Sequence, residues 1–300
     1  MKNTISILET QRAILPEMSA YRGVLEPTFS VEMIPDMDRN LEDRIVWCFM
    51  GMHRRRPKCR YLIHDYRSLS TGFASALRDS LKRKLNAKPD LRIFLNENVR
   101  DVMAFDDGIP YILLDMGVPE SILEYRGTDP YPAYRFCYIG EISKERRSDR
   151  MLEAFVKSNY CSEPFLLIGR CEPKLQARFA SVSSLRFAGR FSQDEVFLML
   201  RQCEYAISHF PNHRPHCFQT PTKLLEYASL GKAILANRSV SNVRIAETLG
   251  VNVVWTGDDV FGSLKLPVQP IHNSGFDARP LLWKRRFRDS GLWKLLDSID

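Results

Sequence analysis

The sequence predicts an α/β protein with two doubly wound domains, in each of which helices cover both faces of a mostly parallel sheet. Short, fully apolar segments, typical of strands buried on both faces, alternate along the chain with segments of helical periodicity. The alternation starts again after residues 124–134, which are rich in Gly, Pro and Tyr and form the best candidate for an interdomain linker. A length of 300 residues with 44% hydrophobic side chains also suits two domains.

The expected first domain spans residues 1–127. Its apolar segments predict strands at 5–8, within 21–35, and at 45–50, 61–63, 91–95 and 111–114, with helices at 72–85 and 98–104. The strand at 61–63 runs into a polar cluster, His64-Asp65-Tyr66-Arg67. Ligands of open α/β sheets bind beyond the carboxyl ends of strands, so this cluster is a candidate site.

The expected second domain spans residues 128–279. Its strands are predicted at 136–139, 165–169, 185–189, 205–208, 233–236 and 251–255, and two of its helices at 150–157 and 196–202. A further helix is expected to start with Thr220 as N-cap and Pro221 in the first helical position, and to end at Gly231.

The balance of 43 basic and 36 acidic residues gives a net charge of +7, which favours anionic partners. Basic clusters occur at 54–58, 82–84 and 284–288, and either face solvent or contact anionic lipid headgroups. They lack regularly spaced aromatic residues for base stacking, which argues against a nucleic-acid-binding module.

The seven cysteines form no C-x-x-C pair, which favours reduced thiols in a cytoplasmic protein over disulfides or a zinc knuckle. Residues 1–15 do not resemble a signal peptide, and no run of 18 apolar residues predicts a spanning helix.

Two helix starts in the second domain favour an anion. Lys223 lies in the first turn of its helix, where a cation is unfavourable unless an anion is bound there. Gly140 is followed by a basic loop with Arg146 and Arg147 that leads into the next helix. Each feature alone also fits an ordinary turn with solvated side chains, but together they suit a diphosphate.

Four further motifs have more than one interpretation. Glu226 pairs with Lys223 at i, i+3 or accepts hydrogen bonds from ribose hydroxyls. His64 is a catalytic or sugar-binding histidine, or a structural one. The Asp36-Met37-Asp38 carboxylates favour a solvated turn over a metal site, and prolines interrupt His209, His213 and His216, so no metal site is predicted.

These motifs resemble the retaining glycosyltransferases of family four, over most of residues 136–256 and more weakly in the first domain. Gly140-Glu141-Ile142, Glu145-Arg146-Arg147 and Met151-Leu152-Glu153-Ala154-Phe155 match the opening of that family's second domain, and residues 223–231 its nucleotide-binding helix. Two positions depart from the family pattern. Glu141 stands in place of an arginine and Phe218 in place of the first glutamate of a Glu-x7-Glu pair.

The resemblance implies the GT-B fold, in which two Rossmann-like domains face a central cleft, the first on the acceptor side and the second binding a nucleotide-sugar. It further implies that the tail at 280–300 packs back on the first domain. Glu226 would hold the ribose of the donor, and Gly140, Arg146, Arg147, Thr222 and Lys223 its diphosphate. His64 would face the transferred sugar, and His64, Arg146 and Lys223 would form the catalytic group.

The main hypothesis from the sequence is a cytoplasmic glycosyltransferase of the hexosyltransferase type. It would move a sugar from a nucleotide-diphosphate donor to a saccharide or lipid-linked hydroxyl, with retention and without metal or cofactor, in the synthesis of a surface polysaccharide or glycolipid. An anionic membrane surface is a further candidate partner, and nucleic acid is not. The departures at Glu141 and Phe218 leave an alternative, a catalytically degenerate scaffold that binds nucleotide or a partner protein.

Overall fold

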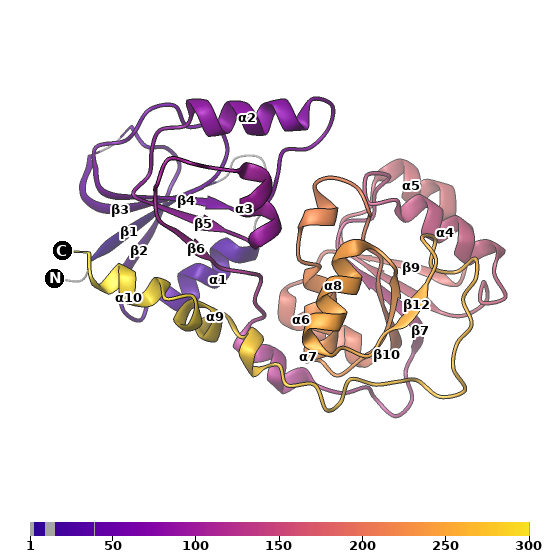
Figure 1. Ribbon diagram of the computed structural model, residues 1–300. Coiled ribbons are helices and arrows are strands. Elements are labelled where there is room, and N and C mark those ends of the chain that lie inside the picture. Colours follow the sequence, from indigo (N-terminus) through magenta and orange to yellow (C-terminus); the bar gives the residue numbers. More distant parts are fainter. Residues whose placement is uncertain (1–2, 10–15, 39, 300) are drawn as a thin grey trace. The chain divides into compact units, whose positions relative to one another are not determined.

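A computed structural model describes residues 3–9, 16–38 and 40–299. The chain divides into two compact units (Figure 1). Unit 1 consists of Met1–Pro119, Phe218–Thr220 and Pro280–Asp300, and unit 2 of Glu120–Cys217 and Pro221–Arg279. Residues 120–127, which the sequence assigned to the first domain, therefore lie in unit 2.

Unit 1 contains a six-stranded parallel sheet in the order β2-β1-β3-β4-β5-β6. The strand order changes direction between β1 and β3, as in flavodoxin-like sheets. The strands are β1 (Thr4–Leu8), β2 (Ser30–Ile34), β3 (Leu41–Phe49), β4 (Cys59–Tyr66), β5 (Leu91–Phe94) and β6 (Tyr111–Leu113). The helices are α1 (Pro16–Leu25), α2 (Ser75–Leu85), α3 (Glu97–Met103), α9 (Trp283–Asp289) and α10 (Leu292–Asp297).

Unit 2 contains a second six-stranded parallel sheet, in the order β12-β11-β10-β7-β8-β9. This is the Rossmann order, with its switch point between β7 and β10. The strands are β7 (Tyr134–Ile139), β8 (Phe165–Ile168), β9 (Leu185–Gly189), β10 (Cys203–Ser208), β11 (Ala233–Asn237) and β12 (Val254–Thr256). The α-helices are α4 (Ser148–Lys157), α5 (Pro173–Phe179), α6 (Gln193–Arg201), α7 (Thr222–Ser229) and α8 (Val240–Leu249), and the 3₁₀ turns are η1 (Glu120–Tyr125) and η2 (His216–Phe218).

Two parallel sheets with flanking helices confirm the predicted α/β architecture. Strand β2 lies within 21–35 as predicted, after the end of α1. Two local predictions were wrong. Strand β12 starts at 254 instead of 251. Helix α7 has Pro221, not Thr220, as its N-cap residue, and the Thr220 hydroxyl instead donates to Asp115 Oδ1 at 2.6 Å and accepts from Asn96 Nδ2 at 3.3 Å. Helices α1, α5 and α8 were not predicted.

The C-terminal tail completes the core of unit 1. The backbone of Val118 exchanges hydrogen bonds with Leu281 and Trp283, at 2.9 and 3.1 Å. The rings of Trp283 and Phe287 then pack edge-on against Tyr21, with centroids 5.5 and 4.9 Å away. A side chain at Gly117 would place its Cβ 2.6 Å from the Trp283 ring, so the turn after β6 needs a glycine.

Residues 218–220 join unit 1 through side chains that follow three of its strands. Ser68, beyond β4, accepts a hydrogen bond from Gln219 at 2.9 Å. Asn96, beyond β5, donates to the Phe218 carbonyl at 3.0 Å, and Asp115, beyond β6, accepts from Thr220. Phe218 is thus part of a backbone segment held at the carboxyl edge of this sheet.

Within residues 3–9, 16–38 and 40–299, no helix combines the length and the apolar composition that crossing a bilayer requires.

Replacing Phe287 with alanine is expected to lower the free energy of unfolding of unit 1 by about 3–5 kcal/mol, because the fully buried ring leaves a cavity beside Tyr21 and Trp47. Urea unfolding followed by tryptophan fluorescence measures this change. Phe73→Ala is the matched control, since that ring is 100% exposed, and it should change stability by less than about 0.5 kcal/mol. Equal effects of the two substitutions would contradict the assigned packing.

Candidate functional site

The candidate site lies in unit 2 at the carboxyl ends of β7 and β10, the switch point of its sheet. Gly140 follows β7 with φ +109° and Gly169 follows β8 with φ +135°. A Cβ on Gly169 would lie 2.0 Å from the Gly140 carbonyl oxygen, and one on Gly140 would lie 2.8 Å from Lys223 Cε. Both positions therefore require glycine, and their close approach allows the Lys223 side chain to lie over the end of β7.

Lys223 is the second residue of α7, so its positive charge lies at the start of that helix. Its Nζ lies 3.3 Å from the Tyr138 hydroxyl and 4.7 Å from the centre of the Tyr138 ring. The first turn of α7 has no acidic residue, so the positive end of the helix dipole and the ammonium group add to one another. An oxyanion is the ligand that relieves this concentration of positive charge.

Two arginines of the loop after β7 lie in the same region. An Arg146 Nη1 donates to His216 Nδ1 at 3.0 Å, which makes Nδ1 an acceptor because guanidinium has only donors. Arg147 adopts a left-handed conformation at φ 54°, which costs about 1 kcal/mol for a residue with a side chain. Arg147 is nevertheless the residue just before α4, next to the free backbone N–H groups at the start of that helix.

His209 follows β10 and provides a buried acceptor. Its Nε2 donates to the Asp258 carbonyl oxygen at 3.0 Å, which leaves Nδ1 with a lone pair. Burial, with smaller contributions from the charges of Lys223 and Arg147, lowers the pKa of His209 to about 4, so the ring is neutral. Nδ1 has no hydrogen-bond partner among the described residues, and it would accept from a ligand hydroxyl.

Glu226 lies one turn along α7 and is buried. Its Oε1 accepts a hydrogen bond from Gln193 Nε2, the first residue of α6, at 2.9 Å. Burial raises the pKa of Glu226 to about 7, against the opposing effects of Gln193 and Lys223. The carboxyl group is therefore held by Gln193 and not by a hydrogen bond from Lys223, and its second oxygen is available to a ligand.

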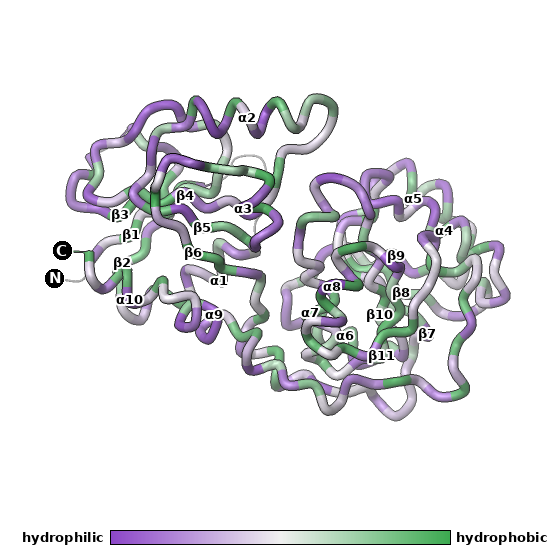
Figure 2. The backbone as a smooth tube through the Cα atoms, viewed as in Figure 1, coloured by the Kyte–Doolittle hydropathy of each residue, from purple (hydrophilic) through white to green (hydrophobic). Residues whose placement is uncertain are grey.

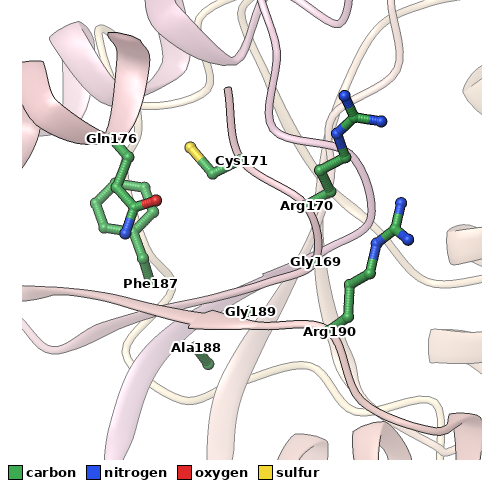
Figure 3. A pocket seen from close by; sticks show the side chains of 8 residues that line it. All are labelled: Gly169, Arg170, Cys171, Gln176, Phe187, Ala188, Gly189 and Arg190. Carbon is green, nitrogen blue, oxygen red and sulfur yellow. The ribbon is translucent and has the colours of Figure 1, made fainter. Parts of the chain in front are cut away.

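A cavity of about 280 Å³ adjoins this region at the ends of β8 and β9 (Figure 3). The side chains of Arg170 and Arg190 lie on one side of it, and those of Phe187, Gln176 and Cys171 lie opposite. Gly169 and Gly189 also line it. The cavity has the polar and aromatic groups that a flat heterocycle would contact.

The structure brings Gly140, Arg146, Arg147, Thr222, Lys223 and Glu226 into one region of unit 2. His64 belongs to unit 1, where it is 1% exposed in β4. Burial, followed by the charges of His53, Arg92 and Arg56, lowers the pKa of His64 to about 3, so it is neutral. Its Nδ1 has no partner in the described part of the chain, and its catalytic role stays a prediction.

Sequence reasoning missed five residues of this region: His209, His216, Gln193, Arg170 and Arg190. A signal existed for both arginines, because each directly follows a glycine at a strand end. No comparable signal marks Gln193, since its contact spans 33 positions. In the described segments, no three His, Cys, Asp or Glu side chains form a metal-binding group, and Asp36 instead accepts from the Asp38 N–H in a turn.

The two doubly wound units have the GT-B fold. HepE from Anabaena, solved with UDP and glucose, is similar over 98% of this chain and 99% of its own, with a TM-score of 0.67 and 10% identity. Sucrose-phosphate synthase from Thermosynechococcus elongatus covers 100% of both chains with a TM-score of 0.66 and 9% identity. WaaG, a glycosyltransferase involved in lipopolysaccharide biosynthesis, covers 98% and 99% with a TM-score of 0.58 and 12% identity.

No family model matches the sequence, and no curated protein matches it. Identities near 10% show a shared fold, and a shared fold alone does not define an activity. The side chains of the site, and not the fold, therefore indicate the chemistry that this protein can carry out.

Gly169→Ala is expected to destabilise unit 2 by about 3 kcal/mol or more, because the new methyl group would meet the Gly140 carbonyl in a backbone conformation that disfavours side chains. Urea unfolding provides the measurement. Gly250→Ala is the control, with φ +65° and no atom within 4 Å of the added Cβ, and it should cost about 1 kcal/mol from backbone strain alone. Equal costs would show that the contact between the two loops does not constrain the site.

Proposed function

We propose that this protein is a glycosyltransferase that transfers a sugar from a nucleotide-diphosphate donor to a hydroxyl acceptor. The observation that carries the proposal is the cationic cluster at the switch point of unit 2, where Lys223, Arg146 and Arg147 meet two helix starts. A diphosphate matches this site in charge and in its number of acceptor oxygens. HepE, which shares the fold, was solved with UDP and glucose, which supports a nucleotide-sugar donor.

The rest of the donor has matching groups in unit 2. Glu226, next along α7 from Lys223, suits the two vicinal hydroxyls of a ribose, because carboxylate oxygens accept from both. The adjoining cavity offers the Phe187 ring and the Gln176 amide to a base. His209 Nδ1, an acceptor without a partner among the described residues, suits a sugar hydroxyl.

The chemistry we propose is retaining and independent of metal. The bond between the anomeric carbon and the diphosphate oxygen breaks, and the acceptor oxygen bonds to the same face of the sugar. The acceptor proton passes to the departing diphosphate, whose charge Arg146 and Lys223 stabilise. His64 is the residue of unit 1 that we assign to contact with the transferred sugar, and its neutral ring suits hydrogen bonding.

We further propose a hexosyltransferase acting in the cytoplasm, with a saccharide or lipid-linked acceptor of a surface polysaccharide or glycolipid. The resemblance of residues 136–256 to family-four glycosyltransferases supports this assignment. WaaG, described as acting in lipopolysaccharide biosynthesis, has the same fold.

A second candidate function is a nucleotide-binding scaffold without transferase activity. It is favoured by Phe218, which stands where the resemblance calls for a sugar-binding glutamate and whose carbonyl is held by Asn96 in unit 1. The two functions share nucleotide binding and differ in whether the donor is consumed.

Calorimetry with UDP and GDP is expected to show binding to the unmodified protein with a Kd between micromolar and millimolar. Lys223→Ala and Glu226→Ala should each weaken binding by about tenfold or more, since each removes charge-assisted hydrogen bonds to the ligand. The exposed residues Lys157 and Glu247 serve as controls, and their alanine variants should bind as the unmodified protein does. Failure of both nucleotides to bind would exclude the proposed donor site.

Slow hydrolysis of the nucleotide-sugar is expected from an enzyme and should disappear in His64→Ala, because the loss of the imidazole removes a contact to the sugar and not to the nucleotide. Chromatography of released UDP or GDP measures it, with nucleotide affinity measured on the same variant. Binding without donor turnover in the unmodified protein would favour the scaffold.

Nucleotide affinity is expected to rise as the pH increases from about 6 to about 8, because Glu226, with a pKa of about 7, accepts hydrogen bonds from both hydroxyls only when ionised. Gln193→Ala removes a hydrogen bond that favours the carboxylate, so the midpoint should move to higher pH. Calorimetry at several pH values with UDP and 2′-deoxy-UDP tests this. An unchanged midpoint in Gln193→Ala, or an equal loss for both ligands, would contradict the ribose assignment.

A further inference from the structure

Helix α2 (Ser75–Leu85) in unit 1 has its polar and apolar sides reversed with respect to an ordinary surface helix. Its only buried residue is Asp79, a charged one. The apolar residues Phe73, Leu77, Leu81 and Leu85 recur every four positions, and they are 100%, 61%, 39% and 40% exposed. The spacing of four places the three leucines on one stripe of the α2 surface, which faces away from Asp79, and the exposed Phe73 precedes the start of the helix.

Polar contacts attach this helix to unit 1. The Asp79 carboxylate accepts from the Ser70 N–H at 3.0 Å, and Arg83 Nη1 donates to the Met103 carbonyl at 3.3 Å. Asn86, just after α2, accepts from the His53 N–H at 2.8 Å. Hydrogen bonds therefore hold the inner side of α2, while none of its stripe residues belongs to the buried core.

Basic residues flank the apolar stripe. Arg78, Lys82, Arg83 and Lys84 lie on α2 itself, and it carries no acidic residue besides the buried Asp79. The loop after β3 is bound to the end of α2, because Asn86 Nδ2 donates to the Gly51 carbonyl and Ala87 N–H to the His53 carbonyl. That loop brings Met52, which is 42% exposed, and the exposed Arg54, Arg55 and Lys58.

Two basic clusters that are separate in the sequence thus form a single surface, which we call the α2 face. It consists of Met52, Phe73, Leu77, Leu81 and Leu85 with Arg54, Arg55, Lys58, Arg78 and Lys84. Figure 1 shows α2 on the outside of the unit 1 sheet, and in Figure 2 its tube alternates between hydrophobic green and hydrophilic purple.

We propose that the α2 face docks on the surface of an anionic lipid bilayer. Helices that lie in the membrane interface combine an apolar stripe with Lys and Arg, because the stripe enters the acyl boundary while the cations contact lipid phosphates. The α2 face has both elements and no exposed carboxylate on the helix to oppose them. A protein partner would need complementary acidic groups, whereas a bilayer provides both the apolar layer and the negative charge.

Co-sedimentation with vesicles tests this on the 300-residue chain. We expect binding to vesicles of mixed phosphatidylcholine and phosphatidylglycerol to be about tenfold or more tighter than to phosphatidylcholine alone, and to weaken in about 0.5 M salt. Phe73→Ser and Leu77→Ser should each weaken it by about tenfold, through loss of apolar burial. Lys84→Gln should weaken it by about fivefold.

Two controls match these variants. Leu198→Ser changes a leucine that is 51% exposed on α6 in unit 2, and Arg288→Gln changes an exposed arginine of the third basic cluster. Both should bind vesicles as the unmodified protein does. Because the altered side chains of the α2 face are exposed, thermal unfolding should be unchanged and should confirm that each variant folds.

Three outcomes would overturn the proposal. The unmodified protein could fail to bind anionic vesicles, or it could bind neutral and anionic vesicles equally. The third is that Leu77→Ser abolishes self-association in analytical ultracentrifugation and leaves vesicle binding intact, which would assign the α2 face to a second copy of the chain.

Discussion

The contact between the Gly140 and Gly169 loops is the constraint on which the candidate site depends. Gly169 presses against the Gly140 carbonyl, and Gly140 lies beneath the Lys223 side chain. A side chain at Gly169 would push the ends of β7 and β8 apart, and one at Gly140 would displace the Lys223 side chain from the end of β7. The two glycines therefore hold the two strand ends together and let the ammonium group of Lys223 lie beside the basic loop.

Two histidines provide hydrogen-bond acceptors within this cationic region without adding positive charge. His216 accepts from Arg146, and His209 stays neutral beside Lys223 and Arg147 because it is buried. Neutral imidazoles supply acceptors without adding positive charge, so the region keeps its attraction for an anion without the full repulsion of further cations. Lysine or arginine at either histidine position would add charge without an acceptor.

The sequence predicted correctly those features that depend on neighbouring residues in the chain, such as buried strands and several of the ends of helices and strands. Strands buried on both faces are apolar throughout, and Lys223 and Gly140 stand at helix and strand ends that the sequence marks clearly. Gln193 and His209 were missed because their contacts come from tertiary packing. Thr220 was misjudged for the same reason: as a Thr before Pro it suits a helix cap, but its hydroxyl oxygen instead accepts from Asn96 and its proton goes to Asp115, both more than 100 positions away. Contacts of this range are not encoded in spacing along the chain.

Unit 1 is assembled from three separate segments of the chain, and this has a consequence for biosynthesis. Its sheet is translated before unit 2, but the aromatic surface formed by Tyr21 and Trp47 is covered by Trp283 and Phe287, which follow unit 2 in the sequence. A nascent chain emerging from the ribosome therefore exposes this surface until residues 283–287 have been made. Closing unit 1 thus follows the synthesis of unit 2, and the chain must avoid aggregation through this surface in the meantime.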